Sequence, residues 1–182
     1  MGDYSLTNSW LANKQTAMRT QGGEEMAVEL TPRGTRGREM PRLLRPLMRA
    51  MSRLSAPLYR RFGDRVRVQG RPVLLLTTLG AKSGKIRKTI VCWFPDGDNA
   101  WLVVASSGGS AKHPAWYVNM ARNPDRVSIE IGRRQFKVEP QSLRGAERAE
   151  AWRRIVSLAP GYAAYQEKTD REIPIVRLRV VA

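Results

Sequence analysis

The sequence predicts a small β-barrel with flanking helices, a mainly β fold of the α+β class. Apolar stretches rich in Val, Ile and Leu recur along the chain, and Gly, Pro, Asn and Asp bound them as they bound strands. Helical periodicity is confined to a few segments. Closing the strands into a barrel would remove the exposed edges that a small open sheet has. The expected strands are 71–78, 87–95, 100–106, 126–131, 135–139 and 173–180.

The connections between these strands carry turn and helix signals. Residues 80–85 (GAKSGK) read as a glycine-bounded turn and residues 96–98 (DGD) as a hairpin turn. A helix over 114–122 starts at a proline and stops before an Asn-Pro pair. A second helix covers 146–158 and ends ahead of Pro-Gly. Short helices are therefore expected between hairpins of the barrel.

The chain ahead of the barrel has a different composition. Residues 1–40 mix polar and charged side chains without sustained periodicity, and we expect a flexible N-terminal segment with a linker at 31–37. Residues 41–62 repeat apolar side chains at steps of three and four, among several Arg, which predicts a basic amphipathic helix. That helix could pack on the barrel or lie on an anionic membrane surface, and one face could serve both. Residues 63–182 would form the barrel domain.

The positive charge is concentrated ahead of the barrel. The net charge is +16, and residues 31–71 hold twelve Arg and two acidic residues, a net charge of +10. Nucleic acid, anionic lipid and a polyanionic cofactor are the candidate partners. We expect no nucleic acid, because the basic strands lack interleaved aromatic residues and the Arg run lies on an apolar helix.

Cysteine and histidine are too scarce for most metal chemistry. Cys92 and His113 are the single residues of their types, which excludes an internal disulfide and Cys-rich or His-based zinc sites, so no metal is expected. No apolar run reaches the roughly 20 residues of a membrane-spanning helix, and the N-terminus lacks the pattern of a secretory signal. These features favour a reducing, cytoplasmic location.

The GAKSGK turn is a candidate anion site. It departs from the phosphate-binding P-loop, because three residues separate its glycines and a strand follows it. It nevertheless combines turn glycines and a hydroxyl with the cations Lys82, Lys85 and Arg87. Backbone N–H groups in such a turn can form an anion-binding concavity. A solvated basic hairpin is the other interpretation.

Two further segments could line a pocket. Residues 106–109 (SSGG) follow a strand and precede a helix, so glycines there would let a ligand approach the backbone. Tyr162 and Tyr165 lie one helical turn apart and could present two hydroxyls. Ordinary loop and packing roles remain open for both. No pair of carboxylates offers acid–base chemistry, so a cofactor should carry any catalysis.

From about Arg71 to the C-terminus the chain resembles the deazaflavin-dependent nitroreductases. The likeness rests on the order and spacing of four segments, which are LLLTTLGAKSGKIRKT, FPDGD, VVASSGGSAKHPAWYVNMARNPDRVSIEIG and APGYAAYQEKTDREIPIV. It implies a split β-barrel of the flavin-reductase, FMN-binding-like type, in agreement with the predicted strands.

The resemblance implies the cofactor F420 (8-hydroxy-5-deazaflavin) in preference to FMN. Its phosphate would meet the basic turn, and the SSGG loop with the following helix would flank the ring and tail. A basic groove suits the phosphate and the poly-glutamate tail electrostatically. The cofactor-binding residues implied are Gly80, Lys82, Ser83, Gly84, Arg87, Ala105, Ser106, Ser107, Gly108, Gly109, Lys112, Ala115 and Trp116.

The activity implied is hydride transfer from the reduced deazaflavin to an electron-poor acceptor. Quinones are a family acceptor class, and some members reduce nitroaromatics. The hydroxyls of Ser106, Tyr162 and Tyr165 are the candidate catalytic groups that stabilise charge on the acceptor. A quinone resides in the bilayer, so we expect peripheral binding to the inner face of the cell membrane through residues 41–62. The alternative is a non-catalytic split-barrel protein that binds F420, a flavin or a lipid.

Three positions depart from the family pattern. Members that accept bulky nitroimidazoles carry a Tyr where this chain has Ala159 and an aromatic residue where it has Cys92. The family Arg ahead of the turn Lys is Ala81 here. We therefore expect a differently shaped acceptor pocket and one fewer cofactor contact.

Overall fold

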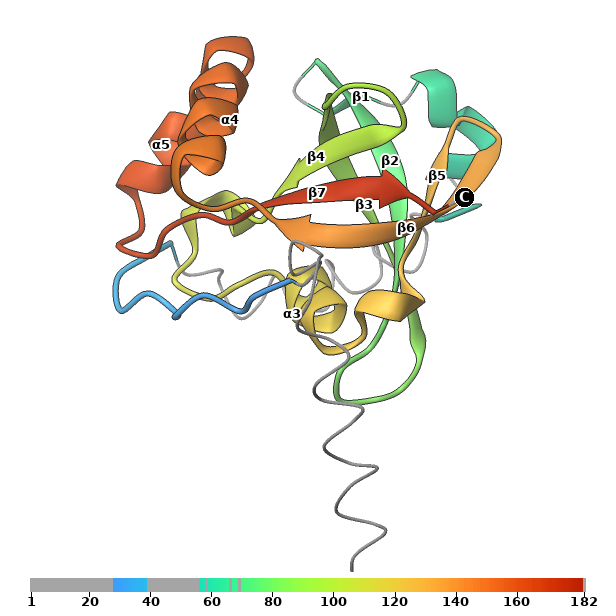
Figure 1. Ribbon diagram of the computed structural model, residues 1–182, viewed down its shortest axis with the longest axis horizontal. Helices are drawn as coiled ribbons and strands as arrows, with labels where there is room; N and C mark the ends of the chain where they lie inside the picture. The colour runs from blue at the N-terminus through green and yellow to red at the C-terminus, as the bar shows by residue number, and fades with distance from the viewer. Residues whose placement is uncertain (1–27, 39–55, 58, 66, 69, 182) are drawn as a thin grey trace, which may run out of the picture.

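The computed structural model describes residues 28–38, 56–57, 59–65, 67–68 and 70–181 (Figure 1). Its strands are β1 (Arg67–Val68), β2 (Arg71–Leu79), β3 (Ile86–Pro95), β4 (Ala100–Val104), β5 (Ser128–Ile131), β6 (Arg134–Ser142) and β7 (Ile175–Val180). Its helices are α3 (Ala115–Arg122), α4 (Gly145–Leu158) and α5 (Gly161–Glu167), with short 3-10 turns η2 (Gly63–Arg65), η3 (Ser107–Gly109) and η4 (Pro124–Arg126).

Antiparallel pairing closes the strands into a barrel. The order is β1-β2-β3-β4-β7-β6-β5, and β2 also pairs with β5. Leu75 of β2 lies opposite Glu130, and Thr77 lies opposite Ser128, so the sheet returns to its own second strand. The closed barrel predicted from the sequence is confirmed, and the short β1 is an addition at its edge.

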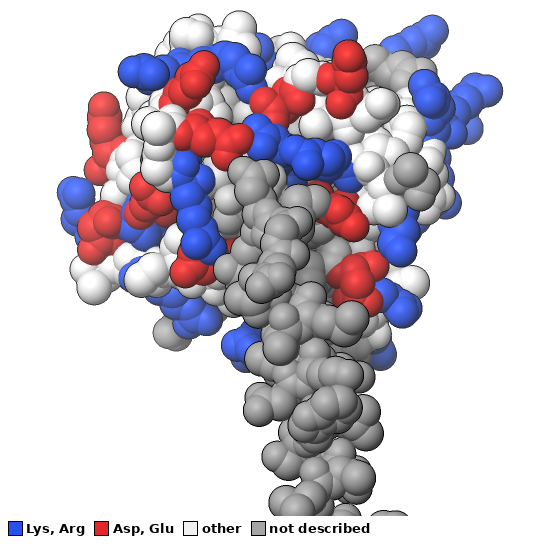
Figure 2. Space-filling model, viewed as in Figure 1, with Lys and Arg blue, Asp and Glu red and all other residues white. Residues whose placement is uncertain are grey.

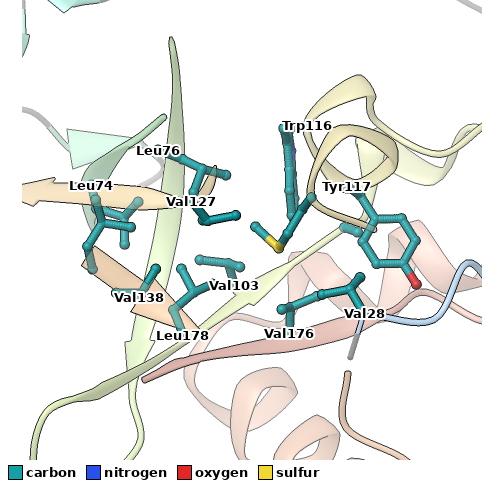
Figure 3. Close-up of a cluster of buried hydrophobic side chains, with 13 residues drawn as sticks. Val28, Leu74, Leu76, Val103, Trp116, Tyr117, Val127, Val138, Val176 and Leu178 are labelled. Carbon is teal, nitrogen blue, oxygen red and sulfur yellow. The ribbon is translucent and has the colours of Figure 1, made fainter. Parts of the chain in front are cut away.

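The barrel interior is filled from alternate strand positions and from α3 (Figure 3). Leu74 and Leu76 point inward from β2, whereas Val73 and Leu75 belong to a separate cluster on the outside. This is the two-residue period of a strand. Trp116 and Tyr117 of α3 close one side of the interior cluster.

A second apolar layer covers the outside of β4 and β7. Helices α4 and α5 pack there, at the upper left of Figure 1. Ile155 of α4 is fully buried, and Tyr162 and Tyr165 of α5 pack against the same cluster. The buried strand residues of this outer cluster are Phe94, Leu102, Val104 and Ile175.

Part of the N-terminal region lies on the barrel. Residues 31–37, expected to be a flexible linker, instead hydrogen-bond to the body: Gly34 N donates to Ala111 O at 3.0 Å, and Thr35 N donates to Asp170 Oδ2 at 3.0 Å. Paired backbone groups explain why this Gly- and Arg-rich stretch takes a fixed course. Residues 1–27 and 39–55 lie outside the described residues, and with them most of the expected 41–62 helix. Residues 56, 57 and 59–62 are helical.

Tyr59 joins this helical stretch to the barrel. Its side chain is fully buried, and its hydroxyl donates to Glu130 O at 2.9 Å. Among the described residues, no helix is long and apolar enough to cross a bilayer.

Candidate active site

The GAKSGK turn is an exposed basic loop with an ordered backbone. Gly80 N donates to Lys85 O at 2.9 Å, and Gly84 N donates to Gly80 O at 2.8 Å. Arg87 and Ser83 meet on the turn, where Nη2 lies 3.4 Å from Oγ. Lys82 and the other turn side chains that follow it are exposed. Their cations are therefore available to an anionic ligand.

Glycine is required at two points of this turn. Gly84 has φ +60°, a left-handed conformation that suits glycine, and the space beside its backbone is open. Gly80 is buried, and a side chain there would meet Ser83 Oγ at 2.6 Å. The turn thus needs both glycines for its shape, and an approaching group can reach the backbone at Gly84.

Two amide side chains, Asn119 on α3 and Asn123 at its C-terminal cap, hold this turn in place. Ala81 N donates to Asn119 Oδ1 at 3.0 Å, and Asn119 Nδ2 donates to Thr78 Oγ1 at 3.2 Å. Asn123 Nδ2 donates to Leu79 O at 3.2 Å. Because α3 is packed into the barrel core, the turn is fixed relative to the core. Neither Asn119 nor Asn123 was predicted from the sequence. An Asn inside the expected helix and another four residues later at its end are nevertheless a signal, since Asn favours such backbone bonds over a helix interior.

The SSGG segment forms a tight loop after β4. Ser107, Gly108 and Gly109 have φ values of +49°, +63° and +79°. A side chain at Gly109 would lie 2.7 Å from Tyr165 O, whereas the space beside Gly108 is open. Gly109 therefore allows α5 to pack directly on the loop, and Gly108 leaves the backbone accessible.

A buried arginine fastens the SSGG loop from behind. Arg171 is 3% exposed, and its Nη2 donates to Ala105 O at 3.0 Å and to Ser106 O at 2.8 Å. Its Nε donates to Ser110 O at 2.8 Å. Burial lowers the pKa of Arg171 from its usual high value. Arg171 was not predicted from the sequence, because a single Arg within the charged stretch TDRE carries no pattern that marks it as buried.

Two tyrosines of α5 form the wall next to this loop. The rings of Tyr162 and Tyr165 meet edge to face at 5.8 Å, and Tyr162 meets Phe94 at the same distance. Burial raises the pKa of Tyr162 above its usual range, and the neighbouring Cys92 and Tyr165 add to the rise. Burial also raises the pKa of the Cys92 thiol. The hydroxyl of Tyr162 therefore keeps its proton at neutral pH.

The remaining predicted residues divide by exposure. Lys112 and Ala115 are exposed, and Ser106 precedes η3 without a side-chain capping bond. Trp116 is 8% exposed and belongs mainly to the barrel core, so little more than an edge of its ring can meet a ligand. His113 lies under residues 28–38, where its Nε2 is 2.8 Å from Thr31 O.

The basic turn and the SSGG loop therefore both adjoin α3 in space or in sequence, and the tyrosines of α5 lie beyond the loop. Asn119 fixes the basic turn, and the SSGG loop precedes the N-terminus of α3 and contacts α5. The profile of the F420H(2)-dependent quinone reductase family matches residues 51–179 of this sequence. The chain belongs to this family.

Relatives with this family name are found in mycobacteria. An F420H(2)-dependent quinone reductase of Mycobacterium tuberculosis (strain H37Rv) is 39% identical over 132 residues, which are 69% of this chain and 87% of that protein. A second M. tuberculosis protein named for the same activity is 37% identical over 108 residues, 59% of this chain and 89% of that protein.

Two solved structures share the fold. An F420-H2 dependent reductase is 41% identical and superposes with a TM-score of 0.54, covering 63% of this chain and 99% of its own. A chain described as a domain-swapped dimer is 35% identical, with a TM-score of 0.55, and covers 73% of this chain and 99% of its own. F420 is thus the cofactor named for the family and for one of these structures.

The residues of the turn suit the family cofactor chemically. The cations Lys82, Lys85 and Arg87 are exposed on one turn, and that turn holds no carboxylate. Such donors match phosphate and carboxylate groups. Ala81 stands where the family resemblance implies an Arg, so one side-chain contact with the ligand is missing. Its backbone N–H still donates to Asn119 Oδ1, so the turn keeps its support from α3.

Proposed function

We propose that this protein reduces a quinone with reduced F420 as the hydride donor. The observation that carries the proposal is the exposed basic turn, held to the core by Asn119, in a chain of the F420H(2)-dependent quinone reductase family. The turn supplies cations and open backbone, and the tyrosine wall supplies an apolar surface with hydroxyl groups. A quinone is flat and apolar with two polar oxygens, which matches that wall.

Lys82, Ser83 and Arg87 would hold the phosphate of the cofactor, with Gly84 giving access to the backbone. The SSGG loop, kept rigid by Arg171, would flank the ring. The remaining contacts proposed are with Gly80, Ala105, Ser106, Ser107, Gly108, Gly109, Lys112, Ala115 and the edge of Trp116. The chemistry that F420 supplies when bound is the transfer of a hydride.

Tyr162, Tyr165 and Ser106 would act on the acceptor. A quinone that gains a hydride becomes a hydroquinone anion, and a hydrogen bond to its oxygen stabilises the charge as it develops. Tyr162 can donate this bond because its phenol is protonated at neutral pH, and burial raises its pKa further. Packing of Tyr162 against Phe94 and Tyr165 fixes the ring, so the hydroxyl is held in place before the acceptor binds.

We also propose that the protein acts on the inner surface of the cell membrane, with residues 41–62 as the main contact. Twelve Arg within 31–71 favour an anionic surface, and each is worth roughly 1 kcal/mol near such a surface. The apolar stripe of the same segment adds a contribution that salt does not screen. A quinone dissolved in the bilayer would then be close to the enzyme.

A titration tests the cofactor assignment. Purified protein is titrated with F420 and with FMN, and fluorescence quenching gives both dissociation constants. We expect micromolar or tighter binding of F420, weaker binding of FMN, and oxidation of reduced F420 when a menaquinone analogue is added. Tight F420 binding without turnover would favour a non-catalytic binding protein, and equal or tighter FMN binding would overturn the assignment.

Co-sedimentation with vesicles tests the membrane assignment. Replacing Arg42, Arg45, Arg49 and Arg53 with Gln in the full chain removes charge ahead of the buried Tyr59 anchor. We expect binding to anionic vesicles to fall sharply while F420 binding stays unchanged. Salt should weaken, without abolishing, binding of the unmodified protein. If the unmodified protein stays in the supernatant with anionic vesicles at low salt, the assignment is wrong.

A further inference from the structure

A basic pocket lies at the end of the barrel away from the GAKSGK turn. It has a volume of about 290 Å³ and is lined by Arg60, Arg61, Phe62, Gly63, Arg65, Gly132 and Arg133. The register of β2 and β5 places Gly132 near the start of β2, whereas the turn follows the end of β2. At about 3.3 Å per residue, the two sites are roughly 20–25 Å apart.

The charges of this basic pocket are only partly compensated. Arg60 pairs with Glu130, since its Nε lies 2.9 Å from Oε2 and its Nη2 lies 2.8 Å from Oε1. Arg61, Arg65 and Arg133 have no ion pair with any carboxylate whose side chain the structure describes. Figure 2 shows Lys and Arg side chains gathered at the upper right, where Figure 1 places the residues before β1 beside β5. Converging guanidinium groups repel one another, and an anion would relieve that repulsion.

A second pocket, which we call the apolar pocket, adjoins the basic one and is lined mostly by hydrophobic residues but also by Arg67. Its volume is about 170 Å³, and it shares Gly63 and Gly132 with the basic pocket. Its other lining residues are Tyr59, Arg67, Pro72, Val73, Trp93 and Ile131. Together the two pockets reach the size of small-ligand sites, about 300–1,000 Å³. Trp93 also carries a buried indole Nε1 with no hydrogen-bond partner among the described residues.

The rim of this double pocket is apolar as well as basic. Phe62, which lines the basic pocket, is 47% exposed, and Val68, which follows the lining residue Arg67, is 43% exposed, although both are large hydrophobic side chains. Arg61 lies over the ring of Phe62, 5.5 Å from its centroid. Alternating guanidinium and apolar groups suit the boundary between lipid headgroups and acyl chains.

We propose that the two pockets form a binding site for an anionic phospholipid. Arg61, Arg65 and Arg133 bind the phosphate, and the apolar pocket takes the part of the lipid that adjoins the headgroup. The site goes beyond the proposed F420 chemistry and deepens only the proposed membrane contact. Nucleic acid fits less well, because its phosphates do not adjoin an apolar group that would fill the second pocket.

The position of the lipid site bears on how a quinone would reach the enzyme. Val68 O lies 3.7 Å from Cys92 Sγ, and Cys92 adjoins Tyr162 in the proposed acceptor wall. The lipid site and the acceptor wall therefore lie at the same end of the barrel. A lipid bound there would orient that end toward the bilayer, from which a quinone arrives.

Binding of soluble ligands to the full chain tests the pocket itself. The probes are dihexanoyl-phosphatidylglycerol below its micelle concentration, dihexanoyl-phosphatidylcholine, inorganic phosphate and a short single-stranded oligonucleotide, each measured by calorimetry. We expect the phosphatidylglycerol to bind at least tenfold more tightly than the other three. Phosphate binding as tightly as the lipid would show a free-anion site, and tighter oligonucleotide binding would show a nucleic-acid surface. Either result would overturn the proposal.

Substitutions locate the binding. Arg61→Gln, Arg65→Gln and Arg133→Gln together should weaken phosphatidylglycerol binding at least tenfold. The matched control replaces three exposed arginines elsewhere, Arg126, Arg153 and Arg179, with Gln, and so changes the net charge equally. Gly63→Leu keeps every charge and places a side chain between the pockets, where the nearest atom is Tyr59 at 3.4 Å. It should weaken lipid binding and leave phosphate binding unchanged.

The outcomes separate this proposal from the proposed function. Equal losses in the pocket and control variants would show that net charge alone attracts the lipid, and the proposal would fail. If lipid binding is unchanged in Gly63→Leu, the lipid does not occupy the apolar pocket, and the proposal that the two pockets form one site fails. F420 binding, measured on the same variants, should stay unchanged, since the turn lies at the other end of β2. A loss of F420 binding alongside the expected loss of lipid binding would count against the placement of the cofactor at the basic turn, whereas unchanged lipid binding in the triple variant would refute the lipid site.

Discussion

Replacing Arg171 with Met should loosen the SSGG loop and weaken F420 binding. Arg171 bonds three carbonyls, those of Ala105, Ser106 and Ser110. Ser106 O also accepts from Gly109 N at 3.0 Å, so among the described residues two carbonyls depend on Arg171 alone. Each buried carbonyl without a donor costs about 1–3 kcal/mol. Removing a buried charge that has no carboxylate partner offsets part of this. We expect the free energy of unfolding to fall by about 2–4 kcal/mol.

Urea unfolding measures the loss in free energy of unfolding. F420 titration, at a temperature where the variant is folded, measures how far the loosened loop lowers the affinity for the cofactor. We expect the affinity to fall by about tenfold, or 1.4 kcal/mol. Arg148→Met is the matched control, because the Arg148 side chain is also largely buried, at 13% exposed, and its Nη2 donates to a carbonyl, Ile173 O at 2.8 Å, but it lies on α4. It should lose stability and keep F420 affinity. A loss under about 1 kcal/mol for Arg171→Met, or equal affinity losses in both variants, would refute the reasoning.

Three further predictions concern other parts of the site. Lys82→Ala and Arg87→Ala should each lower F420 affinity about tenfold. The loss should be smaller at high salt, because both side chains are exposed. Unchanged F420 affinity in both variants would show that the phosphate binds elsewhere. At least one of Tyr162→Phe and Tyr165→Phe should slow quinone turnover while F420 binding stays intact. Full turnover in both variants would show that the two tyrosines serve only in packing. Asp170 accepts hydrogen bonds from Thr35 and Arg36, and these hold its pKa at about 2, below the unfolded value of about 3.9. The stabilising contribution of the Asp170 carboxylate is therefore present above about pH 4 and lost as the pH falls through about 2. At pH 7, Asp170→Asn should speed amide exchange in residues 33–38. Equal exchange rates in the variant and the unmodified protein would show that Asp170 does not hold these residues.

The barrel could be predicted from local pattern because its strands are apolar runs bounded by Gly, Pro, Asn and Asp. In β2 the apolar run gives no period, yet its length and its glycine boundary identify a buried strand. Boundaries were less predictable. Strand β4 ends at Val104, two residues before the prediction, because the carbonyls of Ala105 and Ser106 bond Arg171 instead of a neighbouring strand.

The parts that could not be predicted depend on distant partners. Asp170 lies in a charged stretch that looks solvated, and its bonds go to residues more than 130 positions earlier. Residues 31–37 have linker composition, and only the fold brings their partners near. For Trp116 the family resemblance implies contact with the cofactor, but a packing role in the core was also open. In the structure most of its surface lies in the core.

The separation of the two apolar clusters bears on how this family can diversify. The barrel interior and the outer layer that carries Tyr162 and Tyr165 share no buried residue. Ala159 packs against the outer layer, and Cys92 also lies outside the barrel interior. Mutations at these positions can reshape the proposed acceptor wall without opening cavities in the barrel. Evolution can therefore explore new acceptors on this scaffold at little cost to folding, which makes Cys92 and Ala159 natural starting points for directed evolution.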